Sequence, residues 1–375
     1  MLKGINLTLL MGPAVASPVP QWALDALVSV RVTTTAGKRS GFELSFDVKN
    51  DSPLQTLFLL TGGSVPPVLR TIIVVTINGT PDVIMDGVVT NHQITQGSQP
   101  GHSTLTLTGE DLSAVMDWLD LSGIPYPCLP PEGRVGLMLL KYMFLGVIPK
   151  VIPSVLIDVP IPIERIPTQR GTDLAYINYL ADLVGYVFYI DPGPSPGMSF
   201  AYWGPDIKFG EVQPALNLDM DALSNVESLS FRFDKDKAVL PVVVIQNQET
   251  HVPIPIPIPP ITPLNPPLGA IMPIPNKLEW ISETAKYNPV QGALIGMAKA
   301  SQMADAVSGT GSLDVLRYGR VLKARKLVGV RGVGMAYDGL YYVKSVTHNI
   351  KRGEYKQTFE LTRNGLVSTL QQIPV

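Results

Sequence analysis

The sequence has little charge and almost no cysteine. Asp, Glu, Lys and Arg make up 16% of its 375 residues, and Cys128 is the single cysteine. One cysteine excludes an intramolecular disulfide and a cysteine-rich zinc site. The net charge of −2 comes without a basic stripe or a polybasic tail. Specific binding to the phosphate backbone of a nucleic acid is therefore not expected.

The low charge of so long a chain has two interpretations. Soluble domains average about 25% charged residues, and a chain of this length can form two or three domains with their own cores. Either other subunits cover much of the surface, or the surface is rich in Thr, Ser, Asn and Gln. We expect covered surface and keep the polar surface as the alternative.

Long apolar runs and catalytic motifs are missing as well. Pro or polar residues interrupt every window of 18 residues, so neither a transmembrane helix nor direct membrane insertion is expected. The histidines form no HxH or HExxH arrangement, and there is no GxxxxGK[ST] loop or GxSxG elbow. Residues 329–334 lack the spacing of a nucleotide loop, and the acid pairs Asp219/Asp221 and Asp234/Asp236 lie in polar turns. We predict no catalytic residue, no metal site and no cofactor.

The beginning of the chain permits two interpretations. Residues 1–16 carry one lysine, an apolar middle and an Ala-Val-Ala ending that is similar to a signal-peptide cleavage site. Residues 5–9, however, alternate like a strand, and Gly12-Pro13 interrupts the apolar run. We expect the first strand of a β-domain here and keep a signal peptide as the alternative.

Two stretches far apart in the chain look like copies of each other. The first covers residues 87–109 and the second residues 344–362. Each is an alternating strand, a turn and a second alternating strand, which is typical of half-buried antiparallel strands. His92 and His348 fall near matching positions, which favours a structural role for both. The pattern predicts one β-domain that occurs twice.

Changes of period divide the chain into three regions. Residues 1–110 alternate as strands and contain Asn78-Gly79, the strongest short hairpin signal. Residues 111–200 have helical spacing and predict a mixed helical domain. Residues 201–375 return to strands, with a helix near 280–306. The prediction is an α+β, mainly β fold.

Three helices are expected in the middle region. Apolar spacing predicts the first over 112–119 and the second over 134–144. The third begins after Gly171, where Thr172 or Asp173 can cap it, and ends near Gly185.

A segment dense in proline covers residues 251–275. Proline has no N–H and a fixed φ, so this segment cannot be a central strand or a helix and should be an extended arm. Solvated linkers are usually polar, yet isoleucine alternates with proline here, which favours an ordered arm that contacts a neighbouring subunit. A disordered insertion loop and a site for a proline-recognising module are the alternatives. The candidate interface residues are Ile254, Pro255, Ile256, Pro257 and Ile258.

Three segments in chain order carry a family resemblance. Residues 172–189 resemble a T-D-x-x-F-x-x-x-L-A-x-x-x-G stretch, with Tyr176 or Ile177 at the phenylalanine position. Residues 107–112 look like the end of a first barrel, and residues 341–359 look like a C-terminal hairpin. Together they resemble the phage late control protein D family and related baseplate hub proteins.

The resemblance implies two tail-tube-like antiparallel β-barrels that flank a mixed helical insertion. It also implies a homotrimeric ring of roughly sixfold shape that joins a hexameric inner tube to a trimeric spike. Because the chain stops at Val375, just after the second hairpin, the spike would be a separate protein. The implied partners are the inner tube protein, the spike protein and other baseplate or wedge proteins. The implied place is a virion tail baseplate or an injection particle that assembles in the bacterial cytoplasm.

Elementary geometry agrees with this expectation, because three chains with a duplicated domain present six similar units around one axis. The proline arm is not part of the family pattern. A tail-tube or other baseplate component of the same machinery is the first alternative. A cell-wall hydrolase and a secreted adhesin or carbohydrate-binding protein are further alternatives.

Overall fold

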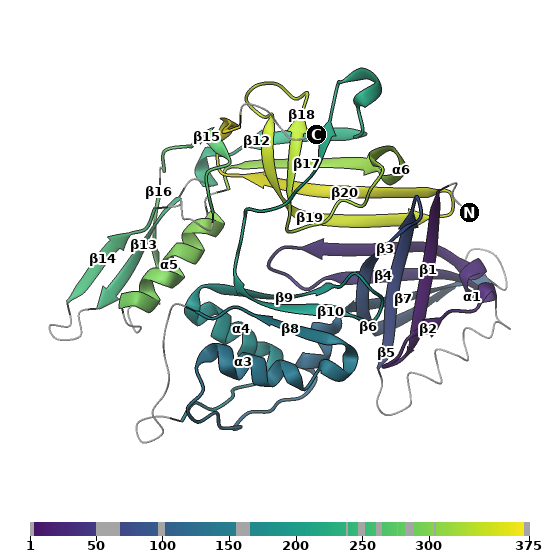
Figure 1. Cartoon of the computed structure of the whole chain (residues 1–375), viewed down its shortest axis with the longest axis horizontal. Coiled ribbons are helices and arrows are strands. Elements are labelled where there is room, and N and C mark those ends of the chain that lie inside the picture. Colours follow the sequence, from purple (N-terminus) through teal and green to yellow (C-terminus); the bar gives the residue numbers. More distant parts are fainter. Residues whose placement is uncertain are drawn as a thin grey trace.

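The fold is mostly strand, which confirms the α+β, mainly β prediction (Figure 1). Expectations that involve the start of the chain before residue 4, His251 and the turn at 97–101 lie outside the described residues. The computed structural model describes residues 4–49, 68–96, 102–154, 166–237, 239–246, 252–259, 265–275, 277–281, 289–303 and 305–370.

The N-terminal half of the main sheet begins with the expected first strand. At the β5–β6 turn, Asn78 and Gly79 have φ values of 49° and 83°, as a two-residue hairpin turn requires. Burial alternates along β4, so one face packs inward and the other is more exposed. The elements are β1 (Ile5–Pro13), β2 (Ser17–Pro18), α1 (Gln21–Ala26), β3 (Leu27–Thr35), β4 (Gly41–Lys49), β5 (Leu69–Ile77), β6 (Thr80–Gln96) and β7 (His102–Asp111).

The C-terminal half of the main sheet comes from residues 212–363. The residues after Phe233 leave this sheet, and the chain returns to it at Val307. The elements along this part of the chain are β11 (Val212–Asn217), η3 (Asp221–Leu223), β12 (Ser228–Phe233), η4 (Lys235–Lys237), β17 (Val307–Asp314), α6 (Val315–Tyr318), β18 (Leu327–Arg331), β19 (Gly339–Lys351) and β20 (Glu354–Arg363). β21 (Leu366–Ser368) follows β20 and lies outside the main sheet.

The two halves have the same order of strands. The first is β3-β4-β7-β6-β5-β1 and the second is β12-β17-β20-β19-β18-β11. They differ at the far end, where β1 is antiparallel to β5 but β11 is parallel to β18. The repetition inferred from the sequence therefore exists at the level of topology.

The bulges of the two hairpins fix how the copies of the repeat align. Each hairpin has one bulge, which leaves Thr90 as the extra residue of β6 and Lys344 as the extra residue of β19. Thr90 therefore aligns with Lys344, and His348 matches Ile94, two residues beyond His92. The two histidines are thus near each other in the repeat but do not occupy the same position.

The two halves join edge to edge within the chain. Residues 345–351 of β19 pair antiparallel with residues 29–35 of β3, which makes one 13-stranded sheet (Figure 1). The inner faces of both halves contribute to a single hydrophobic core, which includes Val30, Phe46 and Val346.

The middle region forms a three-stranded sheet, β8-β10-β9, against which α3 and α4 lie (Figure 1). Trp203 is fully buried in its separate core. The third expected helix is confirmed, since Thr172 Oγ1 accepts from the Ala175 N–H and Gly185 ends the helix with a φ of 70°. The elements are η1 (Leu112–Asp117), α3 (Pro131–Leu140), η2 (Met143–Leu145), β8 (Val147–Val151), α4 (Asp173–Val184), β9 (Tyr186–Pro192) and β10 (Ser199–Pro205).

The first two expected helices differ from the prediction. The first is the 3-10 helix η1, which Asp111 caps by accepting from the Ser113 N–H at 3.0 Å while it also accepts from the Ser40 N–H at 2.7 Å. The second begins earlier, at Pro131, because proline suits the first turn of a helix. It ends at Leu140, where a short 3-10 turn follows.

A peripheral lobe lies between β12 and β17 in the chain (Figure 1). It consists of the sheet β14-β13-β16 and of α5 (Pro289–Met303), with β13 (Val239–Gln246), β14 (Pro253–Pro257) and β16 (Lys277–Ile281). The helix expected near 280–306 is α5. Pro253, Pro255 and Pro257 lie in β14, an edge strand, where a missing N–H is tolerated. Near the lobe, β15 (Gly269–Ile271) pairs with β21.

Candidate interaction surfaces

The exposed face of the main sheet is lined with hydroxyl groups. Thr33 and Thr347 bond across the junction of the two halves at 3.2 Å, and Ser228 and Ser312 bond at 2.8 Å. A shallow depression of about 620 Å³ lies over β12, β17, β19 and β20 and is lined mainly by Ser and Thr. The lining of this depression offers many weak hydrogen-bonding groups and includes one charged residue, Glu360, so it is suited to contact with water rather than to tight binding.

Two strands of the main sheet carry unpaired edges within the described residues. Beyond Val88, β6 pairs with β7 on one side only, and residues 90–96 are exposed. β12 pairs with β17 and shows no partner on its other side. Such edges present backbone N–H and C=O groups that can bind another strand.

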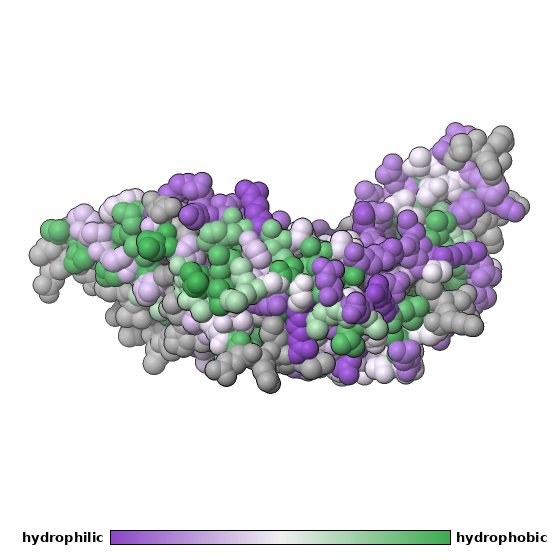
Figure 2. Space-filling model, turned by 90° about the horizontal axis from the view of Figure 1, so that it is seen from above, coloured by the Kyte–Doolittle hydropathy of each residue, from purple (hydrophilic) through white to green (hydrophobic). Residues whose placement is uncertain are grey.

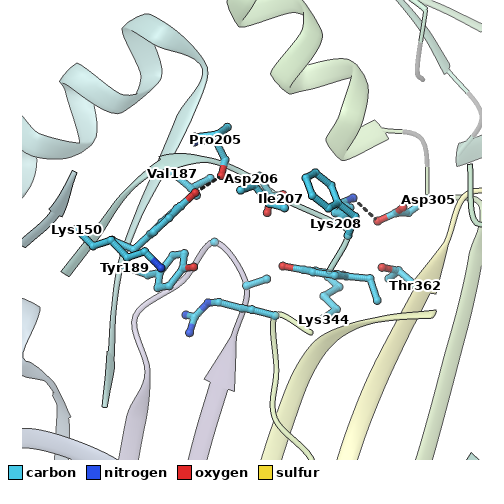
Figure 3. A pocket seen from close by; sticks show the side chains of 16 residues that line it. Lys150, Val187, Tyr189, Pro205, Asp206, Ile207, Lys208, Asp305, Lys344 and Thr362 are labelled. Atoms are coloured by element: carbon cyan, nitrogen blue, oxygen red, sulfur yellow. Dashed lines mark hydrogen bonds and ion pairs between the residues drawn. The ribbon is translucent and has the colours of Figure 1, made fainter. Parts of the chain in front are cut away.

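A pocket of about 480 Å³ lies where the middle region meets the main sheet (Figure 3). Lys208 forms an ion pair with Asp305 at 3.0 Å, and the Tyr202 hydroxyl donates to the Pro205 carbonyl at 2.8 Å. Burial raises the pKa of Asp206, although nearby Lys208 acts in the opposite direction. These groups satisfy one another.

Arg325, which also lines the pocket, links the same regions. Its guanidinium pairs with Asp191 of β9, lies 4.2 Å from the centre of the Tyr189 ring and donates to the Thr35 carbonyl at 3.1 Å. A buried arginine with these partners fixes the middle region against both halves of the sheet. We interpret the pocket as a structural joint.

Exposed apolar side chains gather on the peripheral lobe, at one end of the molecule (Figure 2). Ile254 and Ile256 of β14 are 45% and 38% exposed, whereas Ile258 is buried in the core of the lobe. Ile274 and Trp280 add exposed surface at 83% and 58%. Of the five candidate arm residues, the structure thus brings Ile254 and Ile256 to the surface, flanked by Pro255 and Pro257.

The three histidines that the structure describes lie apart from one another, on different strands of the main sheet. His348 is buried and lies 2.8 Å from the Tyr355 hydroxyl, and burial lowers its pKa to about 3. His102 lies 3.2 Å from Asp47 at the surface, and His92 is exposed on β6. Among the described residues, no group of His, Cys, Asp and Glu could hold a metal ion, and no helix is long and apolar enough to cross a membrane.

The acid pairs singled out in the sequence occupy turns. Asp219 and Asp221 both have a φ of 49°, and Asp234 accepts from the Asp236 N–H at 3.1 Å. The structure brings neither pair together with further acids, histidines or cysteines in the described part of the chain. The unpaired edges of β6 and β12 were not identified from the sequence. The one sequence signal was in β6, whose alternating pattern continues after the residues that pair with β5.

This arrangement is a baseplate hub-like fold, which phage tail proteins and type VI secretion proteins share. The chain is similar to a tail protein from Neisseria meningitidis MC58, with a TM-score of 0.62 and 13% identity over 97% of this chain and 98% of that one. It is similar to the 43 kDa tail protein of prophage MuSo2 from Shewanella oneidensis, with a TM-score of 0.64 and 12% identity over 96% and 98%.

A secretion-system protein shows the same likeness. A chain of the Francisella PdpA–VgrG complex matches with a TM-score of 0.58 and 11% identity over 100% of this chain and 60% of that chain. No protein-family model and no curated protein sequence matches. At these identities the likeness establishes the fold, and it confirms the resemblance inferred from the three sequence segments.

Proposed function

We propose that this protein is a structural baseplate hub. Three copies form a ring that joins a hexameric inner tube to a trimeric spike in a contractile tail or injection machine. The observation that carries the proposal is the duplicated strand order, with the two halves joined edge to edge in one chain. Three such chains present six similar units, which lets a threefold spike meet a sixfold tube.

The three regions of the chain have separate places in this proposal. The two sheet halves, with the boundaries 1–110 and 201–375 expected from the sequence, form the ring, and the region 111–200 projects from it. The hydroxyl-lined depression over β12, β17, β19 and β20 faces the channel, because Ser and Thr side chains bind a passing cargo only weakly. The low overall charge suits large contacts with the tube, the spike and wedge proteins. The protein acts in the virion baseplate or injection particle after assembly in the bacterial cytoplasm.

The proline-bearing strand β14 supplies a further contact in this proposal. Ile254 and Ile256 lie exposed on an edge that prolines close to further strand pairing. They therefore contact a neighbouring protein through side chains rather than through backbone hydrogen bonds.

Mass photometry and negative-stain imaging test the hub. The expected result is a trimer whose class averages show a ring of roughly sixfold outline. Stacked hexamers would instead identify a tail-tube protein of the same machinery. A monomer at micromolar concentration, with no ring in the assembled particle, would contradict the proposal. Activity in a peptidoglycan zymogram would contradict the non-enzymatic role.

A further inference from the structure

The junction between β19 and β3 shows how the two similar halves of this chain contact each other. The two strands pair antiparallel, with Thr347 opposite Thr33 and His348 opposite Val32. Val346 and Ile350 point into the shared core, and Asn349 accepts from Arg31 on the exposed face at 3.3 Å. One chain therefore contains a complete edge-to-edge contact between its two halves.

The shared topology identifies the equivalents of these two strands. β19 and β6 are the first strands of the bulged hairpins, and β3 and β12 are the outer neighbours of β4 and β17. Thr90 is aligned with Lys344 in the two bulged hairpins. The residue pairs between neighbouring strands then extend this alignment through β4 and β17 to β3 and β12. Asn349 then matches Thr95, and Arg31 matches Ser230.

Both equivalent edges are unpaired in the described part of the chain. β5 pairs with β6 only as far as Val88, and β18 pairs with β19 as far as the equivalent residue, Tyr342. On β19 the strand then continues into the pairing with β3. On β6 the matching residues, 91–96, are exposed along their whole length.

We propose that β6 of one chain pairs antiparallel with β12 of a second copy of this chain, in the register of the internal junction. The inference rests on the proposed ring, and it specifies how the chains of that ring are joined. The paired residues are Asn91 with Asp234, His92 with Phe233, Gln93 with Arg232, Ile94 with Phe231, Thr95 with Ser230, and Gln96 with Leu229 of the partner subunit.

The faces of the two strands agree with this register. Phe231 is partly buried against the hydrophobic core, on the inner face of β12. Ile94, which is 48% exposed, lies opposite it and extends that core. A slip of one residue would place Ile94 opposite Ser230 or Arg232 and turn its side chain to the wrong face.

The composition of the edges also fits strand pairing. Residues 91–96 contain no proline, no lysine and no acid, so nothing on β6 blocks another strand. On β12 Arg232 is paired with Asp234 at 3.4 Å and faces Gln93 in the proposed register, so no like charges meet. The edge of β14, by contrast, carries a proline at every second position.

Disulfide trapping tests the register. In a Cys128→Ser background, Thr95→Cys and Ser230→Cys place two thiols directly opposite across the proposed junction, within the 4.4–6.8 Å Cα range of a disulfide. Mild oxidation is expected to give dimers and trimers on a non-reducing gel and no larger species, because the ring closes. The Arg31→Cys and Asn349→Cys pair is the internal equivalent and should lose its thiols without a change in mass class.

The matched control keeps the same face but shifts the register. Thr95→Cys with Arg232→Cys separates the thiols by about 7–8 Å, so this pair should trap poorly. Equal trapping of both pairs would overturn the register. Trimers in mass photometry without trapping at Thr95 and Ser230 would overturn the junction and leave the hub intact. Monomers at micromolar concentration would overturn both.

A charge at the centre of the junction gives an independent readout. Ile94→Asp should abolish trimers in mass photometry while the far-ultraviolet circular-dichroism spectrum stays that of the folded wild-type chain, because Ile94 is 48% exposed in the single chain. Ile274→Asp, on the peripheral lobe, introduces the same change at an exposed isoleucine and should leave the trimer intact. Trimers that survive Ile94→Asp would contradict the proposed edge.

Discussion

Replacing Arg70 with methionine should destabilise the protein strongly. Arg70 on β5 and Asp86 on β6 form a bidentate ion pair at 2.8 and 2.7 Å, and their side chains are only 5% and 0% exposed. Arg70 also donates to the Ala14 carbonyl at 3.0 Å, and the Ser199 hydroxyl donates to Asp86 at 3.0 Å. The pair thus ties three segments together: the β1–β2 turn, the main sheet and β10.

Removal of the arginine leaves Asp86 as a buried charge with Ser199 as its remaining side-chain partner. Breaking a buried pair on one side typically costs about 3–5 kcal/mol, whereas replacing both partners with apolar residues is often close to neutral. We expect Arg70→Met to lower the free energy of unfolding by that amount. The double variant Arg70→Met with Asp86→Leu should recover most of it.

Urea titrations followed by tryptophan fluorescence measure both variants, because Trp203 is buried in the neighbouring core of the middle region. The same titrations give the coupling energy between the two positions. A cost below about 1 kcal/mol for Arg70→Met would show that the pair behaves like a surface ion pair. A double variant as unstable as the sum of the single variants would refute the unpaired-charge explanation.

Two further predictions concern a buried histidine and a glycine that is closely packed between neighbouring strands. His348 stays neutral when folded because burial lowers its pKa to about 3, so the unfolded chain binds one more proton below its ordinary pKa of 6.5. This histidine should lower the free energy of unfolding by about 1.4 kcal/mol per pH unit from 6.5 towards 3, and the free energy from urea titrations of His348→Gln should have a pH dependence shallower by that amount. Gly109→Ala would place a Cβ 2.3 Å from the Phe42 ring and from the Val88 carbonyl oxygen. It should cost about 1–3 kcal/mol, whereas Gly136→Ala in α3, with open space around the new methyl group, should raise the melting temperature.

Local structure was largely readable from the sequence because its signals are local. The Asn78-Gly79 turn, the Thr172 cap and the alternation of β4 each depend on residues within a few positions of one another. The first helix of the middle region was expected to be an α-helix but is a 3-10 helix, and its capping residue Asp111 also bonds to Ser40 from a different part of the chain. Periodicity carries no information about such a distant partner.

The interaction surfaces were harder to predict for the same reason. A paired strand and an unpaired strand have the same alternating pattern, so β6 and β19 look alike in sequence although only β19 continues onto β3. The proline segment was recognisable as extended, since proline restricts φ wherever it occurs. Its place as the edge of a small sheet beside β13 depends on a long-range pairing that the composition cannot specify.

The residues on each open edge strand determine whether another strand can pair with it. β14 places prolines at alternate positions, so its outer edge lacks N–H donors and cannot extend its sheet. The edges of β6 and β12 carry no such protection, and a long unprotected edge is an aggregation hazard unless a partner covers it. A ring in which each β6 meets a β12 covers both edges with the contact that already joins β19 to β3. The internal junction therefore provides the geometry for the proposed ring, and closure of that ring would leave neither edge open.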